Sequence, residues 1–220
     1  MILDPWHPDD SRVTATGKIP LHLAPLQSVI IRTFTNRIVS GKPWSLPGAT
    51  VKTQSIDGPW KLEFIDGGPA LPKPAELQSL ASWTTLPDPA AVDFSGTARY
   101  TTTFDLGGAE DSAVQLDLGN VANTARVFLN DAPAAMSWCA PHLVDISGQL
   151  KPGPNQIAIE VTNLAANRIA DLDRRNVPWK NFHEINFVNI DYQPFDGSKW
   201  PPLDSGLLGP VRLIVRERSR

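Results

Sequence analysis

The sequence predicts an all-β protein, an antiparallel two-sheet sandwich of the jelly-roll type. From about residue 51 onward, short runs with apolar side chains at every second position recur, and few segments have helical periodicity. The connections between these runs are rich in Gly, Pro, Asn and Asp. The 220 residues include 21 prolines, about twice the usual share, which suits many turns between short strands.

Six segments carry the strand pattern most clearly. In GPWKLEF, the apolar Trp60, Leu62 and Phe64 alternate with polar side chains, as in a strand with one buried face. We expect strands at 59–65, 97–106, 113–119, 124–130, 155–163 and 210–216. The side chains expected in the core between the sheets are those of Trp60, Leu62, Leu116, Val127, Ile159 and Leu213.

Two segments favour helix, and two short motifs favour turns. Residues 74–82 (PAELQSLAS) and 164–175 (LAANRIADLDRR) are each long enough for two or three helical turns. Asn130-Asp131 is expected to form a turn, because Asp tolerates the left-handed backbone better than most residues. Ser205-Gly206 is also interpreted as a turn, since no strand–Ser–helix context of a nucleophile surrounds it.

Residues 1–50 differ in character from the rest of the chain. Residues 19–35 hold two apolar runs split by Ala24-Pro25, which predicts two strands or one bent strand, and residues 36–50 have the composition of a linker. We therefore divide the chain into an N-terminal β extension with linker (1–50) and a sandwich (51–220). A segment this short cannot bury a core of its own, so we expect it to pack on the sandwich or pair with another chain.

Composition excludes several classes of function. The chain is 41% hydrophobic and 20% charged, as soluble globular proteins are, and its net charge of −3 gives no field that attracts nucleic acid. No apolar run approaches the roughly 20 residues that span a membrane, and the start of the chain lacks the pattern of a signal peptide. The compartment is left open. The single cysteine, Cys139, is expected to be a small buried hydrophobe.

No cofactor is expected from the residue types and their spacing. The four histidines are far apart in the sequence, and no Cys-x-x-Cys or His-x-x-His spacing is present. A structural Ca²⁺ is not indicated either, because no loop is densely acidic.

An ordered set of phrases gives a family resemblance over about residues 56–216. GPWKLEF, FSGTARYTTTFDL, LDLGNVANTARVFLND, NQIAIEVTN and DSGLLGPVRL occur in this order. The set resembles the C-terminal sugar-binding-type (galactose-binding-like) β-sandwich of α-L-rhamnosidase-like glycoside hydrolases of family 106. It is more distantly similar to the sugar-binding domain of family 2.

The resemblance implies a carbohydrate-associated accessory domain that is itself non-catalytic. Its ligand would be a plant or microbial polysaccharide or oligosaccharide, and the catalytic carboxylates would belong to an upstream domain or chain. Proteins of this kind are often secreted or periplasmic.

Residues 179–200 form the candidate ligand-binding stretch. Exposed aromatic rings suit the C–H face of a pyranose, and neighbouring Asn and Asp side chains can bind its hydroxyl groups. The same rings are explained equally well by packing at the end of the sandwich or against a neighbouring domain. The candidate carbohydrate-binding residues are Trp138, Trp179, His183, Asn189, Asp191, Tyr192 and Trp200.

Two alternatives to the accessory domain stay open. A compact stand-alone enzyme would need two carboxyl groups about 5 Å or about 6.5–9.5 Å apart. The loop carboxylates around residues 171–204 supply its candidates, which are Asp173, Glu184 and Asp191. The second alternative is a protein-docking module. The sequence does not give the sugar specificity or the oligomeric state.

Overall fold

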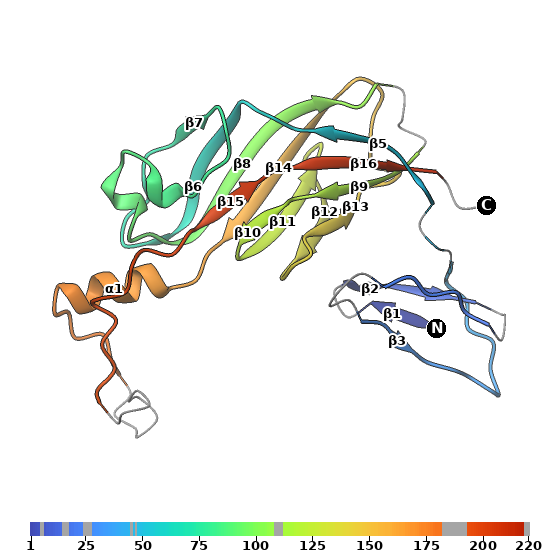
Figure 1. Ribbon diagram of the computed structural model, residues 1–220, viewed down its shortest axis with the longest axis horizontal. Coiled ribbons are helices and arrows are strands. Elements are labelled where there is room, and N and C mark those ends of the chain that lie inside the picture. Colours follow the sequence, from blue (N-terminus) through green and yellow to red (C-terminus); the bar gives the residue numbers. More distant parts are fainter. Residues whose placement is uncertain are drawn as a thin grey trace.

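The protein is a sandwich of two antiparallel sheets, as the sequence predicts. The computed structural model (Figure 1) describes residues 1–4, 7–14, 18–23, 28–44, 46, 48–107, 112–181 and 193–217. The larger sheet has the strand order β12-β11-β14-β8-β6-β7 and the smaller one β13-β9-β16-β5. A further antiparallel pair, β10 (Asn120–Ala122) and β15 (Gly206–Gly209), lies beside them.

The chain passes several times between the two sheets. The larger sheet consists of β6 (Trp60–Gly68), β7 (Ala75–Leu77), β8 (Ser95–Asp105), β11 (Thr124–Leu129), β12 (Ala132–Ser137) and β14 (Pro154–Thr162). The smaller sheet consists of β5 (Thr50–Ser55), β9 (Ala113–Asp117), β13 (Leu143–Asp145) and β16 (Arg212–Arg216).

The core lies between the two sheets and contains every residue that the sequence placed there. Because successive side chains of a strand point to opposite faces, every second position faces the opposite sheet. The ring of Trp83, from a short 3-10 helix (Trp83–Thr85), packs edge-to-face against Phe64 at 5.5 Å and Phe94 at 5.8 Å. The predicted core side chains, all at most 1% exposed, are those of Trp60, Leu62, Leu116, Val127, Ile159 and Leu213.

Three local predictions have mixed outcomes. The helix predicted at 164–175 is confirmed as α1 (Ala166–Arg174), but the helix predicted at 74–82 is wrong. There, β7 pairs with the edge of β6, with Leu77 opposite Trp60, because the sheet edge offers backbone partners that outweigh local helix preference. Asn130 and Asp131 adopt the left-handed conformation of the predicted turn, at φ of 51° and 67°.

Cys139 is only partly buried, which corrects the expectation of a buried position. It follows β12, which is an edge strand of the larger sheet, so that one side of this connection is not covered by a neighbouring strand. Within the described ranges, no helix has the length and apolar character needed to cross a bilayer.

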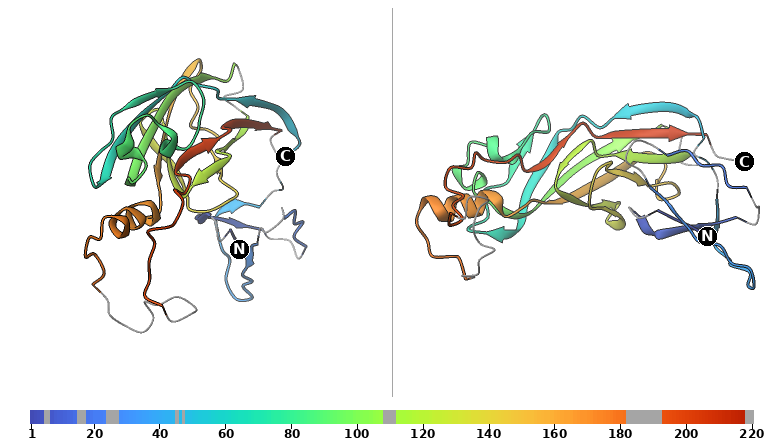
Figure 2. Two further views of the ribbon diagram at one scale, coloured as in Figure 1. Left: turned by 60° about the vertical axis from the view of Figure 1, so that its left-hand side comes forward. Right: turned by 60° about the horizontal axis from the view of Figure 1, so that its bottom comes forward.

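The N-terminal residues form a small separate sheet. Its strands β1 (Ile2–Asp4), β2 (His7–Val13), β3 (Ile30–Ile31) and β4 (Lys42–Pro43) are ordered β3-β1-β2-β4. Among the described residues of 19–35, only Ile30 and Ile31 form a strand, β3, where two strands or one bent strand were expected. Figures 1 and 2 show this sheet and α1 at opposite ends of the molecule.

Candidate functional site at the α1 end

The helix α1 is tied to the returning chain by a side-chain amide. After β14 the chain leaves the sandwich through α1, and residues 193–205 lead back to β15 (Figure 1). The amide of buried Asn167 donates to the carbonyl oxygen of Leu203 (2.9 Å) and accepts from the Leu203 N–H (2.8 Å). The amide thus satisfies both backbone groups of one residue, as a neighbouring strand would.

A buried polar network continues from this point into the sandwich. The Ser205 hydroxyl, 2% exposed, accepts a hydrogen bond from Asn163 (3.0 Å) and donates to Leu203 O (3.2 Å). The Ser205 N–H donates to the Ser82 hydroxyl (3.0 Å), which is itself buried. Because these groups are hydrogen-bonded to one another, burying them is not costly, and the network fixes where the returning chain enters β15. The interpretation of Ser205-Gly206 as a turn is wrong, because Gly206 is the first residue of β15 and Ser205 leads directly into that strand.

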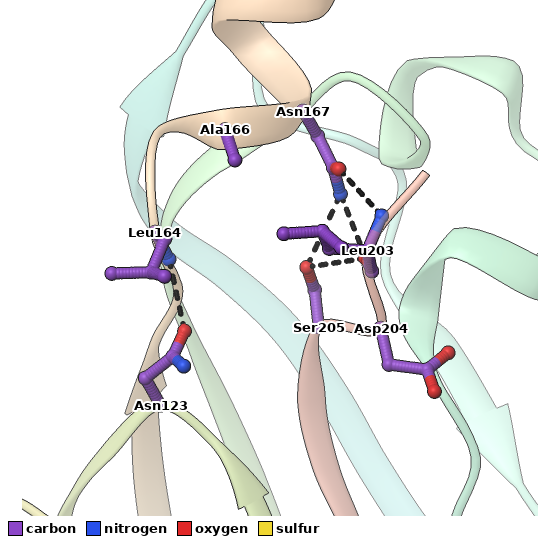
Figure 3. A pocket seen from close by; sticks show the side chains of 7 residues that line it. All are labelled: Asn123, Leu164, Ala166, Asn167, Leu203, Asp204 and Ser205. Carbon is purple, nitrogen blue, oxygen red and sulfur yellow. Dashed lines mark hydrogen bonds between the residues drawn. The ribbon is translucent and has the colours of Figure 1, made fainter. Parts of the chain in front are cut away.

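A small pocket opens beside this network (Figure 3). Its volume of about 30 Å³ holds one water molecule or one hydroxyl or methyl group, and excludes a whole pyranose ring. Leu164 and Leu203 flank it and are 56% and 48% exposed, while the carboxylate of Asp204 points away from Asn167. Its lining residues are Asn123, Leu164, Ala166, Asn167, Leu203, Asp204 and Ser205.

The carboxylate of Asp173, near the end of α1, joins two segments that are distant in the sequence. It accepts hydrogen bonds from Trp179 Nε1 (2.7 Å) and Gly197 N (2.7 Å), and Lys180 Nζ lies 3.1 Å from its Oδ1. Its side chain is only 7% exposed. Burial raises the pKa of Asp173, but the donors Gly197 N–H, Trp179 and Lys180 outweigh burial and lower the pKa below its ordinary value.

Three aromatic rings lie next to this carboxylate. Phe195 packs edge-to-face against Trp179 at 6.0 Å and against Trp200 at 5.3 Å. Lys180 donates to the carbonyl oxygen of Phe195 (2.6 Å) and lies 5.5 Å from the centres of the Trp179 and Phe195 rings. Trp200 remains 42% exposed, so the cluster offers an aromatic surface to solvent. We call Trp179, Phe195 and Trp200 the aromatic cluster.

A second carboxylate on α1 is also engaged. Asp171 accepts from Arg175 through both oxygens (2.7 and 2.6 Å) and from Arg168 (2.5 Å). The hydrogen bonds from Arg175 lower the pKa of Asp171, against the opposing effect of burial. Asp171 and Asp173 are therefore both held as anions. In the described part of the chain, no three His, Cys, Asp or Glu side chains come together as a metal site.

The structure brings together three of the residues predicted from sequence. Asp173 contacts Trp179 directly, and Trp200 joins them through Phe195. Trp138 is 50% exposed and lies elsewhere, in the connection between β12 and β13. The other candidates, His183, Glu184, Asn189, Asp191 and Tyr192, lie outside the described residues.

Sequence reasoning missed the polar residues that hold the site together. Asn163, Asn167 and Ser82 carry no motif, and only the position of Asn163 at the end of a predicted strand hinted at a capping role. Phe195 was missed because the contact that fixes its ring, with Trp179, joins residues 16 positions apart in the sequence.

Sequence comparisons relate the chain to much larger proteins. No protein-family model matches it. A candidate beta-glucuronidase of Formosa agariphila is 30% identical in an alignment of 207 residues that covers 83% of this chain and 17% of that protein. An alpha-L-rhamnosidase of Streptomyces avermitilis is 24% identical in an alignment of 170 residues that covers 75% of this chain and 15% of that protein. The chain thus spans about a sixth of the length of these relatives.

Solved structures give the same relationship. A rhamnosidase from Novosphingobium sp. PP1Y matches 90% of this chain and 18% of its own, with a TM-score of 0.63 and 28% identity. The Ruminococcus gnavus beta-glucuronidase matches 79% of this chain at a TM-score of 0.51 and 22% identity, which supports the fold alone. This chain is a homologue of rhamnosidase- and glucuronidase-type glycoside hydrolases and corresponds to a small β-sandwich part of those larger proteins.

Proposed function

We propose that the chain is a carbohydrate-associated accessory domain of a rhamnosidase-like glycoside hydrolase, that it binds glycan at the α1 end, and that it performs no catalysis itself. The observation that carries the proposal is the homology to glycoside hydrolases about five times as long, of which this chain matches only a small part. In such an enzyme, a plant or microbial polysaccharide or oligosaccharide is the ligand.

The aromatic cluster supports glycan binding at this end of the sandwich. The partly exposed ring of Trp200 is held by Phe195 and Trp179, which in turn is fixed by Asp173. A ring held in one orientation loses little freedom when a sugar stacks on it. The adjacent small pocket suits a single hydroxyl or methyl substituent of the same ligand.

The state of the α1 carboxylates supports a non-catalytic role. A general acid in a glycosidase needs a raised pKa, so that it is protonated when it meets the leaving group. Asp173 and Asp171 instead have lowered pKa values, and their oxygens are occupied by donors from the protein itself. Neither carboxylate has the properties of the acid member of a catalytic pair.

Titration calorimetry with rhamnose-containing and galactose-containing oligosaccharides tests the proposal. We expect Trp200→Ala to weaken binding about tenfold, equivalent to about 1.4 kcal/mol, within the range of one aromatic ring contact. Trp138→Ala is the matched control, because it removes a similarly exposed tryptophan from another part of the sandwich. Its affinity should equal that of the wild type.

The outcomes separate the proposal from its alternatives. No measurable binding of any glycan refutes it, and a loss confined to Trp138→Ala moves the site away from α1. Hydrolysis of aryl glycosides that disappears in Asp173→Asn, Glu184→Gln or Asp191→Asn would establish the stand-alone enzyme instead.

A further inference from the structure

Much of the described N-terminal segment is exposed to solvent. Among the residues before β5 whose exposure is described, which leave out 3–11, 15–17, 24–27, 42, 45 and 47, Ile2 is the one buried hydrophobic side chain. Neighbouring residues of a strand point to opposite faces of the sheet. Ile30 and Ile31, which together make up β3, are 55% and 41% exposed, although Ile2, which pairs with Ile31 and shares its face, is buried. Both side chains of the edge strand β3 are therefore exposed to solvent.

Further apolar side chains around this sheet are exposed to solvent. Ile38 is fully exposed, and Leu21 and Leu23 are each 43% exposed. Soluble proteins rarely leave this much large apolar surface uncovered unless it binds something. β3 is also an edge strand, with backbone groups on its outer side available for one more strand. We call Leu21, Leu23, Ile30, Ile31 and Ile38 the N-terminal apolar set.

The sandwich does not cover this set. The ion pair between Arg12 and Asp145, at 3.9 Å, and the hydrogen bond from Glu217 N to Ala49 O connect the sheet and its linker to the sandwich. Figure 2 shows the sheet standing beside the sandwich end rather than on a sheet face. Of the two possibilities raised by the sequence, packing on the sandwich or pairing with other polypeptide, the structure therefore favours the second.

The charge of the segment indicates what kind of surface would cover it. Residues 1–50 have five basic side chains and three acidic ones, the latter all within the first ten residues. Because the whole chain carries −3 and this segment +2, the remaining residues carry −5. Arg32 and Arg37 flank the ring of Phe34 at 5.0 and 4.3 Å, which places two cations near β3. A complementary surface is apolar at its centre and acidic around it.

We propose that the N-terminal sheet is a docking surface for the remaining part of a larger glycoside hydrolase, supplied by the same polypeptide or by a separate one. This inference rests on the proposed function. The Novosphingobium rhamnosidase match leaves only about 22 residues of this chain uncovered, so more than half of residues 1–50 has a counterpart there. That counterpart sits in a chain about five times as long, which contains ample polypeptide to cover the sheet.

The test measures binding of the full chain to the Novosphingobium rhamnosidase from which the segment matching this chain has been deleted. Sedimentation velocity should show a complex with the wild-type chain that weakens as salt is added, because the rim of the surface is basic. The double variant Ile30→Ser/Ile31→Ser should bind at least about tenfold more weakly, since it removes two apolar contacts. Leu71→Ser, an equally exposed apolar residue of the sandwich, is the control and should bind as the wild type does.

Three results would overturn the inference: no complex with the wild type, equal binding by the double variant, or a wild-type dimer that the double variant abolishes. The last would assign the surface to a second copy of this chain. Both Ile30 and Ile31 are exposed, so the double variant should keep the circular dichroism spectrum and Tm of the wild type. Glycan binding is measured on the same proteins. A complex without glycan binding refutes the glycan site alone, and glycan binding without a complex refutes the docking surface alone.

Discussion

Replacing Asp173 by Asn should loosen the two segments that this carboxylate joins. The two oxygens of the carboxylate serve different donors: Oδ1 accepts from Trp179 Nε1 and faces Lys180, while Oδ2 accepts from Gly197 N. An amide has a single acceptor oxygen. The substituted side chain would therefore satisfy either the Trp179 side or Gly197, and its NH₂ group would face a donor on the other side.

The size of the effect follows from one lost hydrogen bond to a charged, 93%-buried acceptor. Such a bond contributes about 2 kcal/mol, so the local opening free energy of the Gly197 N–H should fall by about that amount. This corresponds to about 30-fold faster hydrogen exchange at that amide. The fold as a whole should persist, because the sandwich core makes no use of Asp173.

Amide exchange measured by NMR on uniformly labelled protein provides the assay. Asp196→Asn is the control: it alters a carboxylate next to Gly197 that hydrogen-bonds to Ser198 N instead. Unchanged protection of Gly197 in Asp173→Asn would refute the reasoning. In the wild type, the folded-state pKa of Asp173 lies below the unfolded value of about 3.9. The protection should therefore be complete above about pH 4 and disappear as the pH falls through the lowered folded-state pKa.

Three further substitutions test the packing around the site. Gly206→Ala should prevent stable folding at 37 °C, since its Cβ would lie 2.2 Å from the Tyr100 hydroxyl at a φ of 104°. Gly107→Ala, with open space around the added Cβ and a φ of 64°, should cost only about 1 kcal/mol in urea unfolding. Leu116→Ala, fully buried, should lower the free energy of unfolding by about 2–5 kcal/mol, and a loss below about 1 kcal/mol would contradict the core assignment. Asn163→Ala removes three hydrogen bonds in a buried network and should cost about 2–3 kcal/mol; an unchanged Tm would show that water replaces it.

The positions of the sandwich strands could be predicted from the sequence because their cause is local. Alternation with a period of two places Leu62, Leu116 and Val127 on the buried face whatever the strand order, and all three are buried. The left-handed turn at Asn130-Asp131 is similarly local, since it depends on which residues tolerate positive φ. The failure at residues 74–82 has the opposite origin, because a sheet edge overrode a local helical preference.

The candidate site could be predicted only in part. Trp179 and Trp200 were identified because rings in Pro-rich connections tend to remain partly exposed, and Asp173 because it is acidic and near them. Their grouping around Phe195 was not accessible, since it depends on how residues 193–200 return past the end of α1. The polar network of Asn163, Asn167 and Ser205 was missed for the same reason.

By itself, the sequence determined the fold class, most of the strand positions and the relationship to glycoside hydrolases, because periodicity, turn chemistry and motif order are properties of neighbouring residues. Only the tertiary structure decided which polar groups meet. It showed that the Asp173 carboxylate is held as an anion by donors on both sides, and that both side chains of β3 are exposed. Both facts depend on which segments far apart in the chain contact one another and which do not. The free energy of a charged or apolar group is set by these spatial surroundings and not by its neighbours in sequence.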